Sequence, residues 1–101
     1  MARIKDACHH VRSKNAGPFW VTVDFFFASK DDFERYSDSP SLQPERIALI
    51  CETQAPQVRR VAVPDLLMVK VTYPRRTPQG GVLERDLHSG QQYVRFLDVE
   101  L

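Results

Sequence analysis

Residues 19–28 constrain the fold more strongly than any other part of the chain. Apolar side chains recur there at every second position, and they are Val21, Val23, Phe25 and Phe27. A period of two is typical of a β-strand, and branched and aromatic residues favour that conformation. Large apolar side chains also occupy the other face near the end of this run, so we expect a central strand. Asp24 is the exception, because it places an acid in the middle of the run on the less apolar face.

The remaining pattern alternates strand-like and helix-like segments. Further strands are predicted over residues 4–11, 57–63, 66–73 and 92–101, with loops over residues 12–18 and 74–81. Helices are predicted over residues 30–36, with Ser29 as N-cap, and over residues 42–52, with Ser41 as N-cap and Pro44 in the first turn. Helices grouped against a mainly antiparallel sheet favour an α+β two-layer sandwich. We expect four or five strands, with one or two helices on one face.

Size and composition favour one ordinary globular domain over residues 1–101. The net charge is only +1, from 14 basic and 13 acidic residues, which argues against nonspecific binding to nucleic acid or to a membrane surface. The first residues have no apolar signal core, and no run approaches the roughly 20 apolar residues of a membrane span. Cys8 and Cys51 match no metal or redox spacing, so we expect two buried, reduced thiols in a cytoplasmic protein.

The loop predicted over residues 12–18 is longer and more charged than a hairpin turn requires. Its polar and turn-forming members are Arg12, Ser13, Lys14, Asn15 and Gly17. Backbone N–H groups near Gly17 can form a concave nest, which Arg12 and Lys14 would close around a carboxylate or phosphate. The alternative is a tightly turned connection whose charges face water.

Asp24 and Lys70 are charges in the middle of two apolar strands. If these strands are neighbours, the two side chains face each other as an ion pair or as an acid/base pair with shifted pKa values. The alternatives are a purely structural pair or two charges on a wet face of the sheet.

Other polar clusters are weaker candidates. The pairs Arg59-Arg60 and Arg75-Arg76 favour either a phosphate-binding rim or a solvated surface, and only one member of a pair within a strand can join a given site. The amides of Gln91 and Gln92, near Asp86, can orient a carboxyl or amide substrate or cap an edge strand. We expect no metal and no nucleophilic thiol, because His9 and His10 should point to opposite faces of a strand beside Cys8.

Several of these segments together resemble a small uncharacterised family of about a hundred residues that is encoded beside acyclic terpene utilisation protein A-like (AtuA-like) proteins. The matching stretches are Arg3-Ile4-Lys5-Asp6, the 12–18 segment with Phe19, Asp24, Val69-Lys70-Val71-Thr72, Pro74-Arg75, Gly90-Gln91-Gln92 and Leu97-Asp98. The resemblance implies work beside a larger AtuA-like partner, in the catabolism of terpenoid or branched acids as thioesters. We expect no cofactor. His10 and Tyr93 depart from the family pattern, which has a small or apolar residue and a histidine at these places.

The chain is also similar to the C-terminal ferredoxin-fold domain of the AtuA-like proteins themselves. The matching features are the 12–18 segment, Leu42-Gln43-Pro44-Glu45-Arg46 and Gly80-Gly81. This similarity implies a ferredoxin-like two-layer sandwich.

Three functions follow as hypotheses. The first is an accessory subunit or interaction module that docks on a larger AtuA-like protein through the 12–18 loop, or binds a carboxylate or acyl-thioester ligand there. The second is a freestanding small enzyme or ligand-binding protein for such ligands, acting at a homodimer interface, since exposed edge strands favour self-association. The third, a nucleic-acid-binding module, would need surface aromatics on the sheet and a basic face, which Trp20 and the near-neutral charge support poorly.

Overall fold

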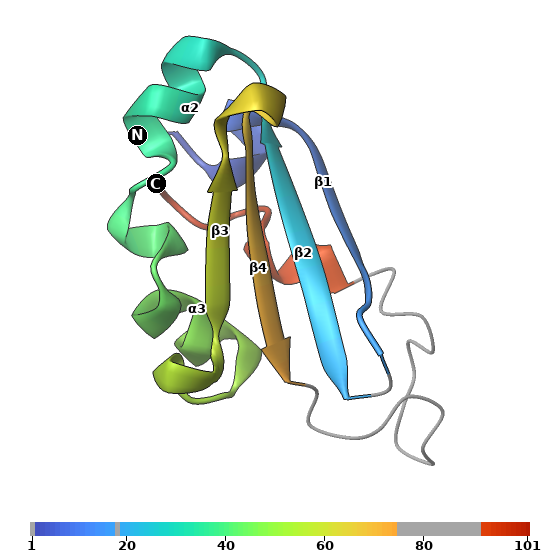
Figure 1. Cartoon of the computed structure of the whole chain (residues 1–101). Coiled ribbons are helices and arrows are strands. Elements are labelled where there is room, and N and C mark those ends of the chain that lie inside the picture. Colours follow the sequence, from blue (N-terminus) through green and yellow to red (C-terminus); the bar gives the residue numbers. More distant parts are fainter. Residues whose placement is uncertain (1, 18, 75–91) are drawn as a thin grey trace.

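The chain folds around one sheet of four strands. The structure is a computed structural model that describes residues 2–17, 19–74 and 92–101 (Figure 1). The strands are β1 (Cys8–Asn15), β2 (Trp20–Phe27), β3 (Arg59–Val63) and β4 (Met68–Pro74). They lie in the order β1-β2-β4-β3, and every neighbouring pair is antiparallel. The prediction of a central strand over residues 19–28 is therefore confirmed.

The sheet topology is consistent with a ferredoxin-like two-layer sandwich. β4 pairs antiparallel with both β2 and β3, so β2 and β3 run parallel to each other with β4 between them. The connection between β2 and β3 is helical, which makes this part a split β-α-β unit. β1 adds a hairpin strand to the far side of β2. The expectation of an α+β sandwich built on an antiparallel sheet is confirmed.

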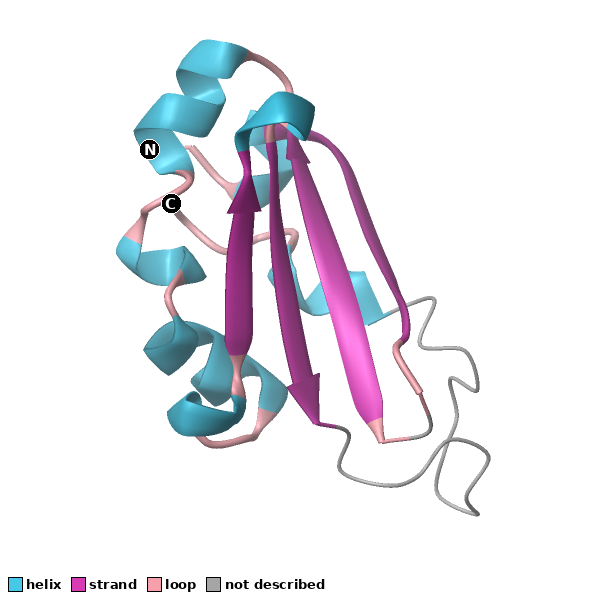
Figure 2. Cartoon of the chain, viewed as in Figure 1, coloured by secondary structure: helices cyan, strands magenta, loops and turns pink. Residues whose placement is uncertain are grey.

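Helices beside and behind the strands in Figure 2 form the second layer, while η3 (Pro64–Leu66) connects β3 to β4 at one end of the sheet. The α-helices are α1 (Ile4–Ala7), α2 (Lys30–Tyr36) and α3 (Pro44–Cys51); the short 3-10 helices are η1 (Pro40–Leu42), η2 (Ala55–Gln57), η3 and η4 (Gln92–Phe96). None of the helices within the described residues is both long and apolar enough to cross a membrane.

Local chemistry explains where α2 and α3 begin. The Ser29 hydroxyl accepts a hydrogen bond from the Asp32 backbone N–H at 3.1 Å, which confirms the predicted cap of α2. The second helix begins at Pro44, two residues later than predicted, and Gln43 rather than Ser41 is its N-cap. Proline disfavours helical geometry in the residue before it, and Gln43 is extended. The chain ahead of Pro44 forms η1 instead.

The hydrophobic core lies between the helices and one face of the sheet. Val23, Phe25, Val69 and Val71 are 0% exposed on that face. The Phe25 ring packs edge-on against Phe96 of η4, with ring centroids 5.3 Å apart. Phe27 makes a similar contact with Phe33 of α2 at 5.9 Å. The alternation read in residues 19–28 therefore marks the buried face correctly.

Both ends of the chain depart from the strands that were predicted there. Residues 4–7 form α1, whose Ile4 and Ala7 are buried on one side three residues apart, and the strand begins only at Cys8. Residues 92–96 form η4, and the last residues contribute only an isolated bridge between Arg3 and Glu100. In both segments the apolar residues are spaced unevenly, so neither can present one continuous strand face to the core.

The predicted loop over residues 12–18 is wrong for its first half. β1 continues through Asn15, and its register places Arg12 opposite Asp24 and Lys14 opposite Thr22. Polar residues form a strand here because the alternation sends Ser13 toward the core and Arg12 and Lys14 to the other face. Gly17 adopts a positive φ of +97° in the short turn that remains.

Candidate functional site

The sheet has a second face, which the described helices leave uncovered (Figure 1). We call it the open face and define it by alternate residues of the four strands: His10, Arg12 and Lys14 of β1; Trp20, Thr22, Asp24 and Phe26 of β2; Arg59, Val61 and Val63 of β3; and Met68, Lys70 and Thr72 of β4. The antiparallel register aligns these side chains in rows across the strands. The central row runs Arg12, Asp24, Lys70, Val61.

The rows on either side of the central one differ in character. One row contains Lys14, Thr22, Thr72 and Arg59, and its two threonine hydroxyls lie 3.2 Å apart in a hydrogen bond. The other contains His10, Phe26, Met68 and Val63, and it is mostly apolar. The open face therefore grades from a polar, basic side through a charged centre to an apolar side.

Asp24 is the most unusual residue of the open face. Its side chain is only 1% exposed, although no described helix covers it. One carboxylate oxygen, Oδ2, accepts a hydrogen bond from Nε of Arg12 at 2.9 Å. The other, Oδ1, is buried and has no hydrogen-bond partner among the described residues. A buried carboxylate oxygen without a partner costs free energy, so stability alone does not account for an acid at this position.

Asp24 holds Arg12 in a defined orientation. The Arg12 guanidinium also lies over the Phe26 ring, with Cζ 5.2 Å from the ring centroid. An ion pair from one side and a cation–π contact from the other fix the plane of the group. The Arg12 side chain is nevertheless 52% exposed, and its two terminal nitrogens make no hydrogen bond to the described residues. Arg12 thus offers the outer edge of its guanidinium to solvent.

Lys70 lies opposite Asp24, as expected for neighbouring strands, but the ion pair that was one of the alternatives is not the one Asp24 makes. Asp24 and Lys70 are direct register partners on β2 and β4. The ion pair that forms, however, joins Asp24 to Arg12 on the opposite side, and Lys70 makes no ion pair within the described part of the chain. The ammonium of Lys70 therefore adds positive charge on the side of Asp24 away from Arg12, in the same row of the open face.

The open face is basic although the whole chain is almost neutral. Within the described strands it carries four cationic side chains, Arg12, Lys14, Arg59 and Lys70, against the single acid Asp24. Net charge averages over all faces of a protein, and so the composition concealed this asymmetry. The cations occupy alternate positions of their strands, which the sequence shows. Only the strand register shows that the cations of β1, β3 and β4 share one face.

The remaining residues of the predicted 12–18 site separate into different environments. Ser13 is buried on the core side, where its hydroxyl accepts a hydrogen bond from the Tyr93 backbone N–H at 3.0 Å and ties β1 to η4. Asn15 is the partly buried last residue of β1. Arg12 and Lys14 belong to strand β1 rather than to the loop, and their register partners Asp24 and Thr22 place both on the open face.

The adjacent arginines of β3 point to opposite faces, as expected. Arg60 is turned to the helix layer, where its Nε donates to the Leu42 carbonyl at 3.0 Å and its Nη2 donates to the Ser37 carbonyl. Arg59 lies on the open face with its Cζ 5.4 Å from the Trp20 ring centroid. Arg60 is therefore a structural residue, and only Arg59 can join a site on the open face.

Some predicted site residues fall outside what can be placed. Arg75 and Gln91 lie outside the described residues, as do Arg76 and Asp86. Gln92 opens η4.

The histidines beside Cys8 do not diverge as predicted. An irregularity in the register between Cys8 and His10 places both histidine rings against Phe26, at centroid distances of 6.3 Å for His9 and 5.7 Å for His10. A β-bulge of this kind breaks the strict alternation on which the prediction rested. Among the described residues, no three histidine, cysteine, aspartate or glutamate side chains come together in a way that could hold a metal ion.

Both thiols are buried, as predicted. Burial raises the pKa of Cys8 to about 12, with a further contribution from the charge of Asp32. Burial also raises the pKa of Cys51 to about 11, partly offset by a hydrogen bond with Tyr73 and by Arg95. The reactive thiolate is therefore scarce at neutral pH, which argues against a nucleophilic role for Cys8.

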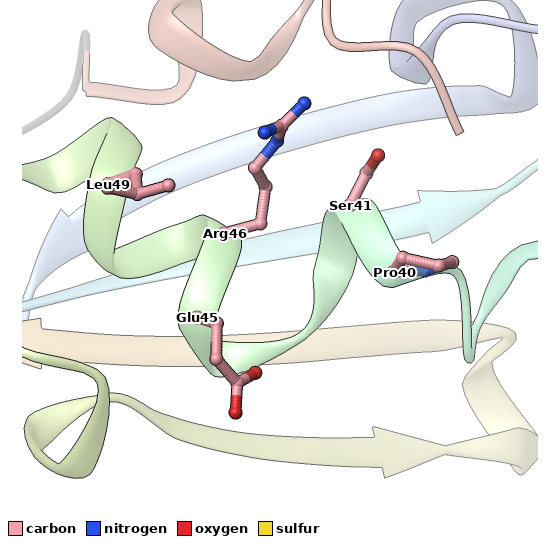
Figure 3. A pocket seen from close by; sticks show the side chains of 5 residues that line it. All are labelled: Pro40, Ser41, Glu45, Arg46 and Leu49. Carbon is pink, nitrogen blue, oxygen red and sulfur yellow. The ribbon is translucent and has the colours of Figure 1, made fainter.

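A separate hollow of about 340 Å³ lies on the helix layer, lined by Pro40, Ser41, Glu45, Arg46 and Leu49. Figure 3 shows Arg46 and Leu49 pointing to the same side of α3 as Ser41, while Glu45 points away. Leu49 is 73% exposed there. The hollow contains none of the residues that the sequence singled out for binding, and it shares no residue with the open face.

The sequence matches a known protein family over almost its whole length. The sequence matches the family described as Domain of unknown function (DUF4387) over residues 4–100. The chain belongs to the DUF4387 family. No curated protein and no solved structure matches it. The match spans β1 to β4 and all the residues of the open face, so this DUF4387 domain and the candidate site are one unit.

Proposed function

We propose that this DUF4387 protein is an accessory subunit or interaction module that works in the cytoplasm and docks on a larger AtuA-like catabolic protein through its open face. The observation that carries the proposal is the buried, half-satisfied Asp24 in the centre of a basic sheet face that no described helix covers. A partner surface would cover the exposed side chains of this face, among them Arg12, which Asp24 holds in place. The open face thereby replaces the 12–18 loop as the docking surface and retains its two cations.

Charge indicates what kind of surface fits. The four cations of the open face favour a partner with an acidic patch or a complex in which an anionic ligand lies between the two proteins. The resemblance to proteins encoded beside AtuA-like proteins favours the second arrangement, because the acids and thioesters of terpenoid or branched-acid catabolism carry such charges. The subunit would then help to complete the ligand site of its partner.

Co-purification with the neighbouring AtuA-like protein tests the proposal. Lys70→Glu reverses a charge at the centre of the open face and should abolish the complex. Arg46→Glu makes the same change on the helix layer and should leave the complex intact. Loss of the complex with Arg46→Glu but not with Lys70→Glu would overturn the assignment of the docking face. Failure of the wild-type proteins to associate would overturn the subunit proposal itself.

A second function is favoured by the free guanidinium edge of Arg12, which suits a freestanding ligand-binding protein or small enzyme for a carboxylate or acyl thioester. In that case the chain alone, or its homodimer, would bind or turn over the ligand without a partner. Activity of the isolated chain that is unchanged by the AtuA-like protein would favour this function over the subunit.

A further inference from the structure

Within the open face, we propose that Arg12 is the receptor for the carboxylate of a small amphipathic acid and that Asp24 is the residue that positions it. The proposal shares the open face with the proposed function and specifies the ligand that this face would bring to a complex. It assigns the head of the ligand to the central row of the face and the tail to the apolar row beside it.

The geometry of Arg12 suits a carboxylate head. Its Nε is committed to Asp24 at 2.9 Å, and its plane is held over the Phe26 ring. The two terminal nitrogens, which bond to nothing in the described part of the chain, present parallel N–H donors that match the two oxygens of a carboxylate in a bidentate contact. Because the guanidinium is already fixed, little side-chain freedom is lost on binding.

The charges around Arg12 make the site attractive to an anion despite Asp24. Asp24 lies on the inner side of the guanidinium and is covered, whereas the ligand would meet the outer edge. Lys14 follows Arg12 by two residues on the same face of β1, and Lys70 flanks Asp24 on β4. Neither ammonium group makes an ion pair within residues 2–17, 19–74 and 92–101, so together they outweigh the single carboxylate, whose charge Arg12 already balances.

The apolar row explains why the acid should carry a hydrocarbon tail. Phe26 and Val63, both partly exposed, lie two positions along their strands from Asp24 and Val61, a separation of roughly 7 Å, whereas Met68 between them is 5% exposed and fills the sheet surface. Val61 is also exposed at the edge of the face. A chain of a few carbons attached to a carboxylate at Arg12 would reach this row and bury apolar surface on it.

The same face has aromatic and basic residues that a sheet binding single-stranded nucleic acid would use, but its rings are engaged. The Arg59 guanidinium lies over the Trp20 ring, and Phe26 is bordered by Arg12 and by both histidines. Stacking of a base would have to displace these groups, whereas a hydrocarbon tail can pack on Val61 and Val63 and leave the rings engaged. The observations therefore favour a small acid.

Titration of the isolated chain with 3-methylbutanoate, followed by NMR, tests the proposal. The acid should shift the signals of Arg12, Lys70 and Phe26, and the uncharged analogue 3-methylbutanamide should bind at least tenfold more weakly. Acetate should also bind about tenfold more weakly, because it lacks the tail. Equal binding of acid and amide, tighter binding of inorganic phosphate, or displacement of the acid by an oligothymidylate would each overturn the proposal.

Three variants locate the site and separate positioning from folding. Arg12→Lys retains the positive charge but loses the paired N–H donors of the guanidinium. It should weaken binding about tenfold with an unchanged melting temperature. Asp24→Asn should weaken binding several-fold and remove the slowly exchanging Nε–H signal of Arg12, a signature that a merely structural role would not affect. Arg46→Lys, on α3, should change neither the binding of the acid nor the Nε–H signal of Arg12. Full affinity in Arg12→Lys would overturn the assignment even if Asp24→Asn failed to fold.

Binding by the isolated chain is measured without the AtuA-like protein, so the two proposals fail separately. A complex without carboxylate binding would overturn only the ligand assignment. Carboxylate binding without a complex would overturn only the subunit proposal.

Discussion

The two faces of the sheet bury their central residues to the same extent but for different reasons. On the helix side, Val23 and Phe25 are 0% exposed and lie in an apolar core. On the open face, Asp24, between them in sequence, is 1% exposed but carries a charge and leaves one oxygen without a partner among the described residues. Burial of the apolar pair stabilises the fold, whereas burial of Asp24 opposes it. Burial of Val23 and Phe25 therefore contributes to stability, whereas burial of Asp24 serves to hold Arg12 in one orientation.

The largest effect is expected on the core face. Phe25→Ala removes a fully buried ring that packs against Phe96, and it should lower the free energy of unfolding by about 3–5 kcal/mol. Chemical denaturation measures the change. A loss below about 1 kcal/mol would mean that the helix layer does not pack on β2 as described.

The two adjacent arginines of β3 should differ in how much they contribute to stability. Arg60 is 14% exposed and donates to the Leu42 and Ser37 carbonyls, so Arg60→Ala should cost about 2–3 kcal/mol of unfolding free energy. Arg59→Ala, on the open face, removes one cation–π contact and should cost about 0.5–1 kcal/mol. Denaturant titration measures the unfolding free energy of both variants. A larger loss for Arg59→Ala than for Arg60→Ala would contradict the assignment of these side chains to the two faces of β3.

Neighbouring residues of β1 give a smaller contrast. Ser13→Ala leaves the Tyr93 N–H without its acceptor and should destabilise the protein by about 1–2 kcal/mol. Lys14→Ala, one residue further on the open face, should change stability by less than about 0.5 kcal/mol. Thermal unfolding of the two variants measures the difference, and equal stability of the two would show that Ser13 does not link β1 to η4.

The smallest effect near neutral pH comes from the thiols. The folded pKa values of Cys8 and Cys51, about 12 and 11, lie above the ordinary value of 9.0. The unfolded chain therefore releases these protons first as the pH rises. The stability due to the neutral buried thiols is complete below pH 9 and is lost between about pH 9 and pH 12.

The melting temperature measured from pH 8 to pH 10.5 checks this prediction. Cys8→Val should show a shallower decline than the wild-type protein over that range. Identical pH profiles would contradict the burial of Cys8, and so would rapid alkylation of both thiols in the native protein at pH 8.

The sequence was sufficient to predict features that depend on local periodicity. The alternation around Phe25 identified the central strand and its buried face, and Ser29 identified the start of α2. The register of Asp24 with Lys70 was also predicted correctly, because both charges interrupt apolar strands at equivalent places.

Features that depend on tertiary contacts were not predictable in the same way. The polar end of β1 looked like a loop, since only pairing with β2 makes a strand of Arg12 to Asn15. Asp24 was assigned to Lys70, although Arg12 approaches it from the other side. A bulge near Cys8 reoriented His9, and the packing of Phe96 on Phe25 turned an expected strand into η4. Each of these outcomes depends on a neighbour distant in sequence.

The most direct test measures two quantities on Asp24→Asn, namely its dissociation constant for 3-methylbutanoate and its free energy of unfolding. Because Asp24 orients Arg12 and carries an unpartnered buried oxygen, the affinity should fall several-fold while stability changes by no more than about 1 kcal/mol. A variant that binds the acid as tightly as the wild-type protein, but unfolds much more readily, would contradict the account.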